Sequence, residues 1–284
     1  MAEKSAQKIY GVLGYPARHS LSPAMHNAAF RSVGLKAEYL IFEKDPSQLE
    51  GFLDSLNNSG ISGLNVTVPY KEKVSKFLTN VSADARLIQA VNTIKVEGNS
   101  LSGFNTDGQG FMRHLSGELG FNPAGKRLAI LGAGGASKAI SVYLSKNNPS
   151  TVTIYDIDRE KVRSLVGYLE RNFPLVSFNV AHSTKDLSVE KCDLLINATP
   201  VGMKEDDPCL IDESMINPGS LVYDLIYNPA ETKLLSRAKK RGARISNGLG
   251  MLLWQGAHSF EIWTGLKAPV EVMKKALESS IYKH

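Results

Sequence analysis

The chain is poor in cysteine and contains no long hydrophobic run. Its 284 residues include only two cysteines, Cys192 and Cys209, and none of its six histidines forms a His-x-x-x-His pair. A disulfide framework and a zinc site are therefore not expected, and we predict no bound metal. No apolar segment approaches the ~20 residues that cross a bilayer, and Met1–Lys8 lacks the apolar core of a signal peptide. These absences predict a reduced, cytoplasmic protein that binds no membrane.

Charge of neither sign dominates the chain. The net charge is +5, and the densest basic run, Lys239-Lys240-Arg241, ends an apparent helix, where cations stabilise the helix dipole. The scatter of the other charges argues against a nucleic-acid partner, whereas a mild basic excess suits anionic small molecules. With 43% hydrophobic residues, the chain can bury the core of one large domain or of two ordinary ones.

Short apolar strands alternate with helical patterns, which predicts an α/β fold with parallel sheets and helices on both faces. Ten strands are many for one sheet, so we divide them between two. The expected strands are Ile9–Leu13, Ala37–Phe42, Gly63–Val68, Asn92–Val96, Arg127–Leu131, Thr151–Tyr155, Ser177–Val180, Asp193–Ile196, Leu221–Leu225 and Ala243–Ile245. The expected helices are Pro23–Val33, Pro46–Leu56, Phe111–Leu119, Gly135–Ser145, Glu160–Asn172 and Thr232–Arg241.

A domain boundary is expected in the glycine-flanked stretch Gly108–Gly125. The segment from Gly248 to the end has apolar residues at helical spacing and follows the last strand of the second half. We expect it to pack back on the first domain and to leave a cleft between the two domains.

The stretch from Asn65 to Lys71 is the most informative part of the first half. Alternation places Asn65 and Thr67 on one face of a strand, and Pro69 should end that strand because it cannot donate to a sheet ladder. Lys71 then lies just past the carboxyl end of the strand, which is the edge where ligands bind in open α/β sheets. An ordinary strand followed by an exposed lysine would explain this stretch taken alone.

The second half contains the elements of a phosphate-binding turn. The apolar strand Arg127–Leu131 is followed by a small-residue turn and then by a helical run. Glycines permit a tight turn and a close approach of a pyrophosphate, and the helix N-terminus supplies N–H donors. The turn consists of Gly132, Ala133, Gly134, Gly135 and Ala136, with Ser137 at the third glycine position of G-x-G-x-x-G. We therefore expect a nicotinamide dinucleotide cofactor here.

Acidic residues after the next strand bear on the choice between NAD and NADP. Asp156 ends Thr151–Tyr155 and can bind both ribose hydroxyls of NAD, and Asp158 adds a second acid. A carboxylate here repels a 2′-phosphate, so these residues favour NAD. Lys138 and Arg159 lie nearby in the chain and could offset the acids.

Several polar residues lie at element ends, where ordinary structural roles compete with ligand binding. Ser20 and Ser22 precede a helix that begins with Pro23, and two hydroxyls there suit a carboxylate; capping explains Ser22 but not Ser20. Asp107 lies in the turn Gly103–Gly108 and could simply cap the following helix. Other polar candidates lie at strand ends or in the last helix: Asn92, Asn197, Tyr227 and Gln255. Taken singly, Tyr227 would be explained by packing and Gln255 by solvent exposure.

Taken together, these segments resemble the shikimate dehydrogenase family from about Tyr10 to Leu266. The ordered set of matching motifs is Ser20-Leu21-Ser22-Pro23, Asn65 to Lys71, Ala90-Val91-Asn92-Thr93, Asn105-Thr106-Asp107-Gly108, Gly132 to Ser137, Asn197-Ala198-Thr199-Pro200, Tyr227-Asn228-Pro229 and Gly248 to Gln255. The resemblance implies an N-terminal open α/β substrate-binding domain, residues 1–107 with 248–284. It also implies a Rossmann-type, doubly wound dinucleotide-binding domain, residues 108–247.

The resemblance also implies an activity: NAD(P)-linked interconversion of 3-dehydroshikimate and shikimate, a step towards chorismate and the aromatic amino acids. Lys71 and Asp107 would be the catalytic pair, with Lys71 as the acid and base. Ser20 and Ser22 would hold the substrate carboxylate, and its remaining contacts would come from Thr67, Lys71, Asn92, Asp107, Tyr227 and Gln255. The cofactor would contact Gly132 to Ala136, Leu225 and Gly248, beside Asp156, Asp158 and Arg159. We expect a monomer or a homodimer.

One departure from the family pattern leaves alternatives open. Asp156-Ile157-Asp158 stands where NADP-dependent members, the family norm, carry Asn-Arg-Thr, which is similar to the NAD-accepting quinate/shikimate branch. A catabolic quinate/shikimate dehydrogenase is therefore the nearest alternative. A non-catalytic dinucleotide-binding sensor would have no need of a charged Lys71–Asp107 pair, and a folate-linked dehydrogenase would have no need of Ser20 and Ser22.

Overall fold

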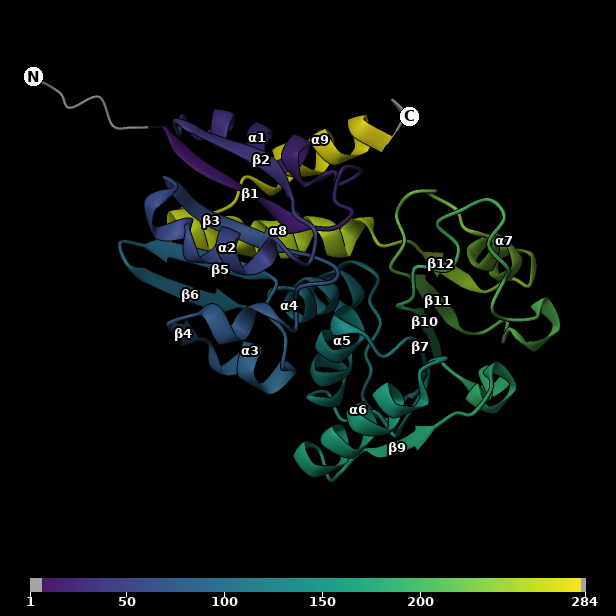
Figure 1. The fold of residues 1–284 in the computed structure, drawn as a ribbon. Coiled ribbons are helices and arrows are strands. Elements are labelled where there is room, and N and C mark those ends of the chain that lie inside the picture. Colours follow the sequence, from purple (N-terminus) through teal and green to yellow (C-terminus); the bar gives the residue numbers. More distant parts are fainter. Residues whose placement is uncertain (1–6, 282–284) are drawn as a thin grey trace, which may run out of the picture. The chain divides into compact units, whose positions relative to one another are not determined.

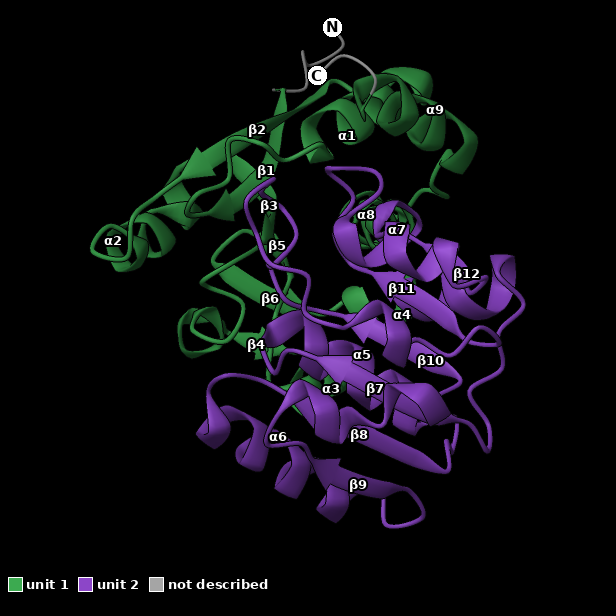
Figure 2. Cartoon of the chain, turned by 90° about the vertical axis from the view of Figure 1, so that its right-hand side faces the viewer, with its two compact units in different colours: residues 1–110, 252–284 green, residues 111–251 purple. Residues whose placement is uncertain are grey.

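The computed structural model describes residues 7–281. The chain divides into two compact units, residues 1–110 with 252–284 and residues 111–251 (Figure 2). The division expected from the sequence had its boundaries at 107/108 and 247/248. No helix within the described residues is long and apolar enough to cross a membrane.

A six-stranded mixed sheet forms the centre of the first unit. Its strand order is β2-β1-β3-β5-β6-β4 (Figure 1). The strands are β1 (Lys8–Gly14), β2 (Ala37–Glu43), β3 (Ile61–Val66), β4 (Asn80–Val81), β5 (Thr93–Glu97) and β6 (Ser100–Phe104).

The expectation of a wholly parallel sheet was wrong for this unit. Strands β1, β2 and β3 are parallel, but β5 runs antiparallel to β3, and β6 antiparallel to β5. The second of these pairings has a local cause, a tight hairpin between β5 and β6 in which Gly98 adopts a φ of 57° that favours glycine. Gly103 and Phe104, expected in a turn, therefore end a strand that the sequence analysis missed because it contains no β-branched residue.

Helices of the first unit come from both ends of the chain. They are α1 (Ser22–Ser32), α2 (Leu49–Asp54), α3 (Ala83–Ile88) and α9 (Val270–Ile281), while α4 (Asp107–Met112) and α8 (Leu249–Thr264) each cross a unit boundary. Helices α1 and α9 pack side by side (Figure 1). On α8, the Trp263 indole N–H donates to the Ile94 carbonyl of β5 at 2.9 Å, which ties this helix to the sheet. The C-terminal segment thus belongs to the same unit as the N-terminal strands.

The second unit contains an entirely parallel, doubly wound sheet. Its order is β12-β11-β10-β7-β8-β9. The strands β8 and β9 follow on one side of β7, and β10, β11 and β12 follow on the other side, which is the Rossmann arrangement. The fold class expected from the sequence is confirmed. The elements are β7 (Arg127–Leu131), α5 (Gly135–Ser145), β8 (Thr151–Tyr155), α6 (Arg159–Asn172), β9 (Ser177–Val180), β10 (Leu194–Asn197), β11 (Leu221–Asp224), α7 (Lys233–Lys240) and β12 (Arg244–Ser246).

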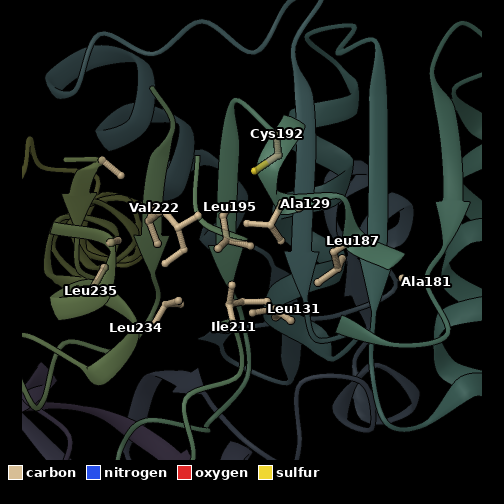
Figure 3. Packing of buried hydrophobic residues seen from close by; sticks show 14 residues of the cluster. Ala129, Leu131, Ala181, Leu187, Cys192, Leu195, Ile211, Val222, Leu234 and Leu235 are labelled. Atoms are coloured by element: carbon tan, nitrogen blue, oxygen red, sulfur yellow. The ribbon is translucent and has the colours of Figure 1, made fainter. Parts of the chain in front are cut away.

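Aliphatic side chains from the parallel strands form a core on one face of this sheet. Figure 3 shows Leu131 of β7, Leu195 of β10 and Val222 of β11 packed near Leu235 of α7. All are nearly or fully buried, and each such side chain stabilises the fold by roughly 1.5–3 kcal/mol. Because the strands are rigidly packed, the loops at their carboxyl ends start from fixed positions.

His26 of α1 is an unusual component of the core of the first unit. Its ring stacks on Tyr39 of β2 at 4.5 Å and lies 5.3 Å from the Trp263 ring. Within the described residues, neither ring nitrogen has a hydrogen-bond partner. Burial lowers the pKa of His26 from 6.5 to about 3, because no group compensates for the loss of water around a charged imidazole.

This burial predicts a loss of stability in acid. The unfolded chain binds a proton at residue 26 below pH 6.5, whereas the folded chain resists it down to about pH 3. The free energy of unfolding should therefore fall by about 1.4 kcal/mol per pH unit in that window because of His26 alone. We expect His26→Leu to gain about 3 kcal/mol relative to the wild type between about pH 7.5 and pH 4.5.

Urea unfolding at both pH values measures this difference, because the other titrating groups contribute equally to both proteins. His19→Leu, at an exposed position of the same unit, is the matched control and should show no such gain. The same pH dependence in His26→Leu and wild type would contradict the prediction.

Candidate functional site

Lys71 and Asp107 form an ion pair in the first unit. The Lys71 Nζ lies 2.6 Å from the Asp107 Oδ2, and the two side chains are 16% and 6% exposed. Lys71 follows the turn after β3, and Asp107 is the first residue of α4, directly after β6. The structure thus brings together an amine and an acid that are 36 residues apart in the sequence.

Asn92 holds the other oxygen of the same carboxylate. Its Nδ2 donates to the Asp107 Oδ1 at 2.8 Å and to the Thr106 Oγ1 at 2.9 Å. The Thr106 backbone N–H donates to the Asn92 Oδ1 at 2.8 Å, which fixes the orientation of the amide. Both oxygens of Asp107 are therefore held, one by an ammonium group and one by an oriented amide.

The two serines at the start of α1, Ser20 and Ser22, are arranged differently from what the sequence predicted. Leu21 precedes the helix at the cap position and makes no side-chain cap bond, while the Ser20 Oγ accepts the Ser22 N–H at 3.3 Å. The prediction that Ser22 caps the helix was wrong, because Ser22 already lies within its first turn. Burial raises the pKa of Tyr39 well above 10.0, and a hydrogen bond with the Ser22 side chain partly offsets this.

Thr67 and Gln255 complete the predicted substrate residues of this unit. Thr67 is half-buried just after β3, and its backbone N–H donates to the Leu13 carbonyl at 2.9 Å, which fixes it beside β1. Gln255 is buried on α8, and its Nε2 donates to the Leu252 carbonyl of the same helix at 2.7 Å.

The glycine-rich turn in the second unit has the backbone that a phosphate site needs. Gly132 has a φ of +102°, and a Cβ there would lie 2.8 Å from the Ala198 carbonyl oxygen. Around Gly134, at the cap position of α5, a Cβ would meet no atom within 4 Å. The backbone at this helix N-terminus is therefore open to a ligand, and these residues fit a dinucleotide phosphate. Ala133 lies in the same turn, and Gly135 and Ala136, expected in it, are the first two residues of α5.

Asp156 connects this turn to the end of β8. Its Oδ2 accepts the Ala133 N–H at 2.8 Å, and its Oδ1 accepts the Asp158 N–H at 2.9 Å. Asp158 caps α6 by accepting the Lys161 N–H, and that bond lowers the pKa of Asp158. Between the two acids Ile157 is 88% exposed, and Arg159, the first residue of α6, is exposed as well.

Asp224 is a buried acid that the sequence analysis did not identify. Its Oδ1 accepts from the Asn197 Nδ2 and the Ile226 N–H, both at 3.0 Å, and its Oδ2 accepts from the Thr232 hydroxyl at 2.7 Å. Burial raises the pKa of Asp224, which these donors partly offset. The carboxylate thereby joins the segments that follow β10 and β11. Its position at the end of an apolar strand was the available signal.

The other predicted residues of the second unit lie in these segments. Leu225 and Tyr227 follow β11 and are half-buried. Gly248 packs so tightly that a Cβ there would lie 1.9 Å from the Leu225 carbonyl oxygen, which only glycine allows. Within residues 7–281, no group of three or more His, Cys, Asp or Glu side chains is placed to hold a metal ion.

Tyr39 and Asn65 are two further polar residues that are linked to Asn92, and the sequence predicted no role for Tyr39. The Tyr39 hydroxyl donates to the Asn65 Oδ1 at 2.8 Å, and the Asn65 Nδ2 donates to the Asn92 carbonyl at 3.2 Å. The alternation along β3 identified the face that carries Asn65, but Tyr39 carried no local signal.

Comparisons with known proteins agree with these observations. The family model described as the shikimate dehydrogenase substrate binding domain matches residues 12–94, and that of the shikimate 5'-dehydrogenase C-terminal domain matches residues 248–278. A shikimate dehydrogenase (NADP(+)) of Methanopyrus kandleri is 44% identical, over 95% of this chain and 94% of that relative.

Solved structures of similar proteins with bound ligands were also found, among them the following two. Shikimate 5-dehydrogenase of Listeria monocytogenes, in complex with shikimate and NAD, is 35% identical with a TM-score of 0.85, over 95% of this chain and 96% of that one. The Thermus thermophilus enzyme, in complex with NADP(H) and shikimate, is 32% identical with a TM-score of 0.86, over 96% and 99%.

Two glycines of the turn should respond differently to alanine. Gly132→Ala should destabilise the protein by about 1 kcal/mol or more, since its φ is left-handed and its Cβ would collide with Ala198. Gly134→Ala should keep the stability of the wild type, because its φ of −81° suits alanine and its surroundings are open. Its methyl group should nevertheless weaken dinucleotide binding by occupying the space next to the helix N-terminus.

Thermal unfolding and titration with the reduced dinucleotide, followed by fluorescence, measure the two effects separately. Binding by Gly134→Ala as tight as that of the wild type would rule out this turn as the phosphate site.

Proposed function

The chain belongs to the shikimate dehydrogenase family, and we propose that it catalyses the reversible NAD(P)-linked reduction of 3-dehydroshikimate to shikimate. This reaction is a step of the pathway to chorismate and the aromatic amino acids. The observation that carries the proposal is the Lys71–Asp107 pair, a proton donor held by an oriented carboxylate.

The reaction needs a proton at one defined oxygen. Reducing a ketone develops negative charge on the carbonyl oxygen, and a bound nicotinamide supplies the hydride. Lys71 gives its Nζ proton to that oxygen during reduction and accepts it during oxidation. Asp107, fixed by Asn92, holds the ammonium group in place and accepts from a neighbouring substrate hydroxyl.

The other polar residues suit recognition of a carboxylated polyol. Ser20 and Ser22 bind the substrate carboxylate at the start of α1, where the helix dipole favours an anion. The ring oxygens are bound by Thr67, Asn92 and Gln255, and Tyr227 lines the pocket. The partial burial of these side chains supports this assignment, because hydrogen bonds gain strength where water is scarce.

The cofactor is a nicotinamide dinucleotide, and NADP is the family norm. The turn from Gly132 to Ala136 holds its pyrophosphate, and Leu225 and Gly248 contact the nicotinamide end. We propose in addition that NAD is accepted. Two acids flank Ile157 in place of a phosphate-reading arginine, and Asp156 is fixed by two backbone N–H groups beside the turn. The exposed Arg159 is a nearby cation that, like Lys138, could compensate for the charge of a 2′-phosphate.

The relatives favour this assignment over the alternatives. A catabolic quinate/shikimate dehydrogenase and a non-catalytic sensor are not favoured, since curated relatives that are 40–44% identical to this chain are named shikimate dehydrogenase (NADP(+)).

A cytoplasmic location is a proposal that rests on two cysteines that form no disulfide. The expected state, a monomer or a homodimer, stays a prediction that sedimentation can measure.

Replacing the proposed acid and base should abolish most turnover. Lys71→Met keeps the length of the side chain but removes its proton, so we expect kcat to fall by about 10²-fold or more while shikimate binding is largely kept. Steady-state kinetics and calorimetric titration with shikimate measure the two quantities. Lys73→Met, two residues away and exposed, is the control. Near-normal turnover in Lys71→Met would exclude Lys71 from this role.

A two-by-two assay tests the substrate and the cofactor together. Shikimate and quinate are each oxidised with NAD and with NADP, and initial rates give kcat/KM for the four pairs. We expect shikimate to exceed quinate with either cofactor, and NAD to support measurable turnover because of the acids at 156 and 158. No oxidation of shikimate with either cofactor would overturn the proposed function, and oxidation with NADP only would overturn the inference on NAD.

A further inference from the structure

A cluster of hydroxyl and amide groups lies inside the first unit, behind the Lys71–Asp107 pair. Its members, hereafter the interior polar cluster, are each at most 6% exposed: Asn65, Asn92, Thr93, Thr106 and Ser259. They come from β3, β5 and the segments before β5 and α4, and Ser259 comes from α8. Polar groups so deeply buried are stable only if their hydrogen bonds are made within the protein.

Ser259 and Thr93 lie at the centre of this cluster. Their hydroxyl oxygens are 2.8 Å apart, and the Asn65 Nδ2 donates to both, at 2.9 Å and 3.2 Å. The Thr93 hydroxyl donates to the Asn92 Oδ1 at 2.9 Å, and the Ser259 hydroxyl donates to the Gln255 carbonyl at 3.0 Å. Each hydroxyl therefore connects Asn65 to a residue that belongs to the candidate site.

The cluster determines which way Asn92 faces. The Asn92 Oδ1 accepts from the Thr93 hydroxyl and from the Thr106 N–H. With its oxygen held there, the Asn92 Nδ2 must point to the Asp107 Oδ1, which it contacts at 2.8 Å. The orientation of the carboxylate that pairs with Lys71 thus depends on two donors, the Thr106 N–H and the Thr93 hydroxyl, and the hydroxyl is itself fully buried.

We propose that Thr93 and Ser259 are positioning residues for the reaction. Thr93 holds the side chain of Asn92, which in turn orients Asp107 and Lys71. Ser259 links this group to α8, the helix that carries Gln255. The proposal rests on the proposed function. Both side chains are 0% exposed, and their oxygens are occupied by protein groups, so they act through Asn92 and Gln255 and do not contact substrate.

Two substitutions at residue 93 separate the hydroxyl from the packing. Thr93→Val keeps the shape and removes the hydroxyl, whereas Thr93→Ser keeps the hydroxyl and removes a methyl group. We expect Thr93→Val to lower kcat at least about tenfold with KM for the dinucleotide unchanged, because small misplacements of catalytic groups slow the chemical step strongly. Thr93→Ser should keep a kcat within about twofold of the wild type even if its melting temperature falls, since the orienting bond is retained.

Ser259→Ala provides a second, independent test, with Ser280→Ala as its matched control. Both serines donate to the carbonyl four residues earlier in their helix, but Ser280 lies on α9, outside the cluster. We expect Ser259→Ala to lower kcat and Ser280→Ala to leave it unchanged. If Thr93→Val does not fold, the comparison of Ser259→Ala with Ser280→Ala still tests the positioning role.

The outcomes distinguish this inference from the proposed function. If wild-type protein oxidises shikimate and Thr93→Val, Thr93→Ser and Ser259→Ala all match its kcat, the positioning role is wrong and the function stands. If wild-type protein oxidises no shikimate, the function on which the inference rests is wrong. A kcat that follows the melting temperature across all four variants would mean a merely structural role and would overturn the inference.

Discussion

The carboxylate of Asp107 is the group on which the first unit's site depends. It is almost fully buried, and a buried charge without partners costs several kcal/mol. Lys71 supplies the opposite charge and Asn92 supplies an amide, so three segments must meet: the turn after β3, the start of β5 and the end of β6. The antiparallel hairpin of β5 and β6 brings the last two side by side. The same contacts that satisfy the charge also orient Lys71, the proposed proton donor.

Next to that carboxylate, the interior of the first unit contains hydrogen-bonded polar side chains at positions where apolar side chains would be more usual. Such groups must make nearly all of their hydrogen bonds, which leaves few arrangements open to them. Thr93 and Ser259 share one amide donor, Asn65, which also accepts from Tyr39. The resulting hydrogen-bonded order extends from β2 to α8 and leaves little freedom for Lys71 and Asp107, the proposed catalytic side chains.

The second unit achieves its geometry mainly through the backbone. Gly132 and Gly248 allow main-chain approaches that a Cβ would prevent, and Gly134 leaves the N-terminus of α5 open. Two acids then hold the loops: Asp156 binds the glycine-rich turn, and Asp224 joins the segments after β10 and β11. These two carboxylates accept hydrogen bonds from backbone N–H, amide and hydroxyl groups, and the sheet fixes where each loop begins.

Much of this molecule follows from the sequence by itself. Ten of the twelve described strands were predictable because alternation, glycine and proline act within a few residues, and the parallel sheet of the second unit followed from them, whereas β4 and β6 were missed. The position of Lys71 just past a strand and the glycine-rich turn were visible for the same reason, whereas the pairing of Asp107 with Lys71 was expected from the family resemblance. Only the tertiary structure decided the mixed sheet, the partner of Ser22 and the roles of Tyr39, Asn65, Thr93 and Ser259. Asn65 contacts Tyr39 and Ser259, which lie 26 and 194 residues away in the chain, and Thr93 contacts Ser259 across 166 residues. A hydroxyl or amide carries no local mark of such a distant partner.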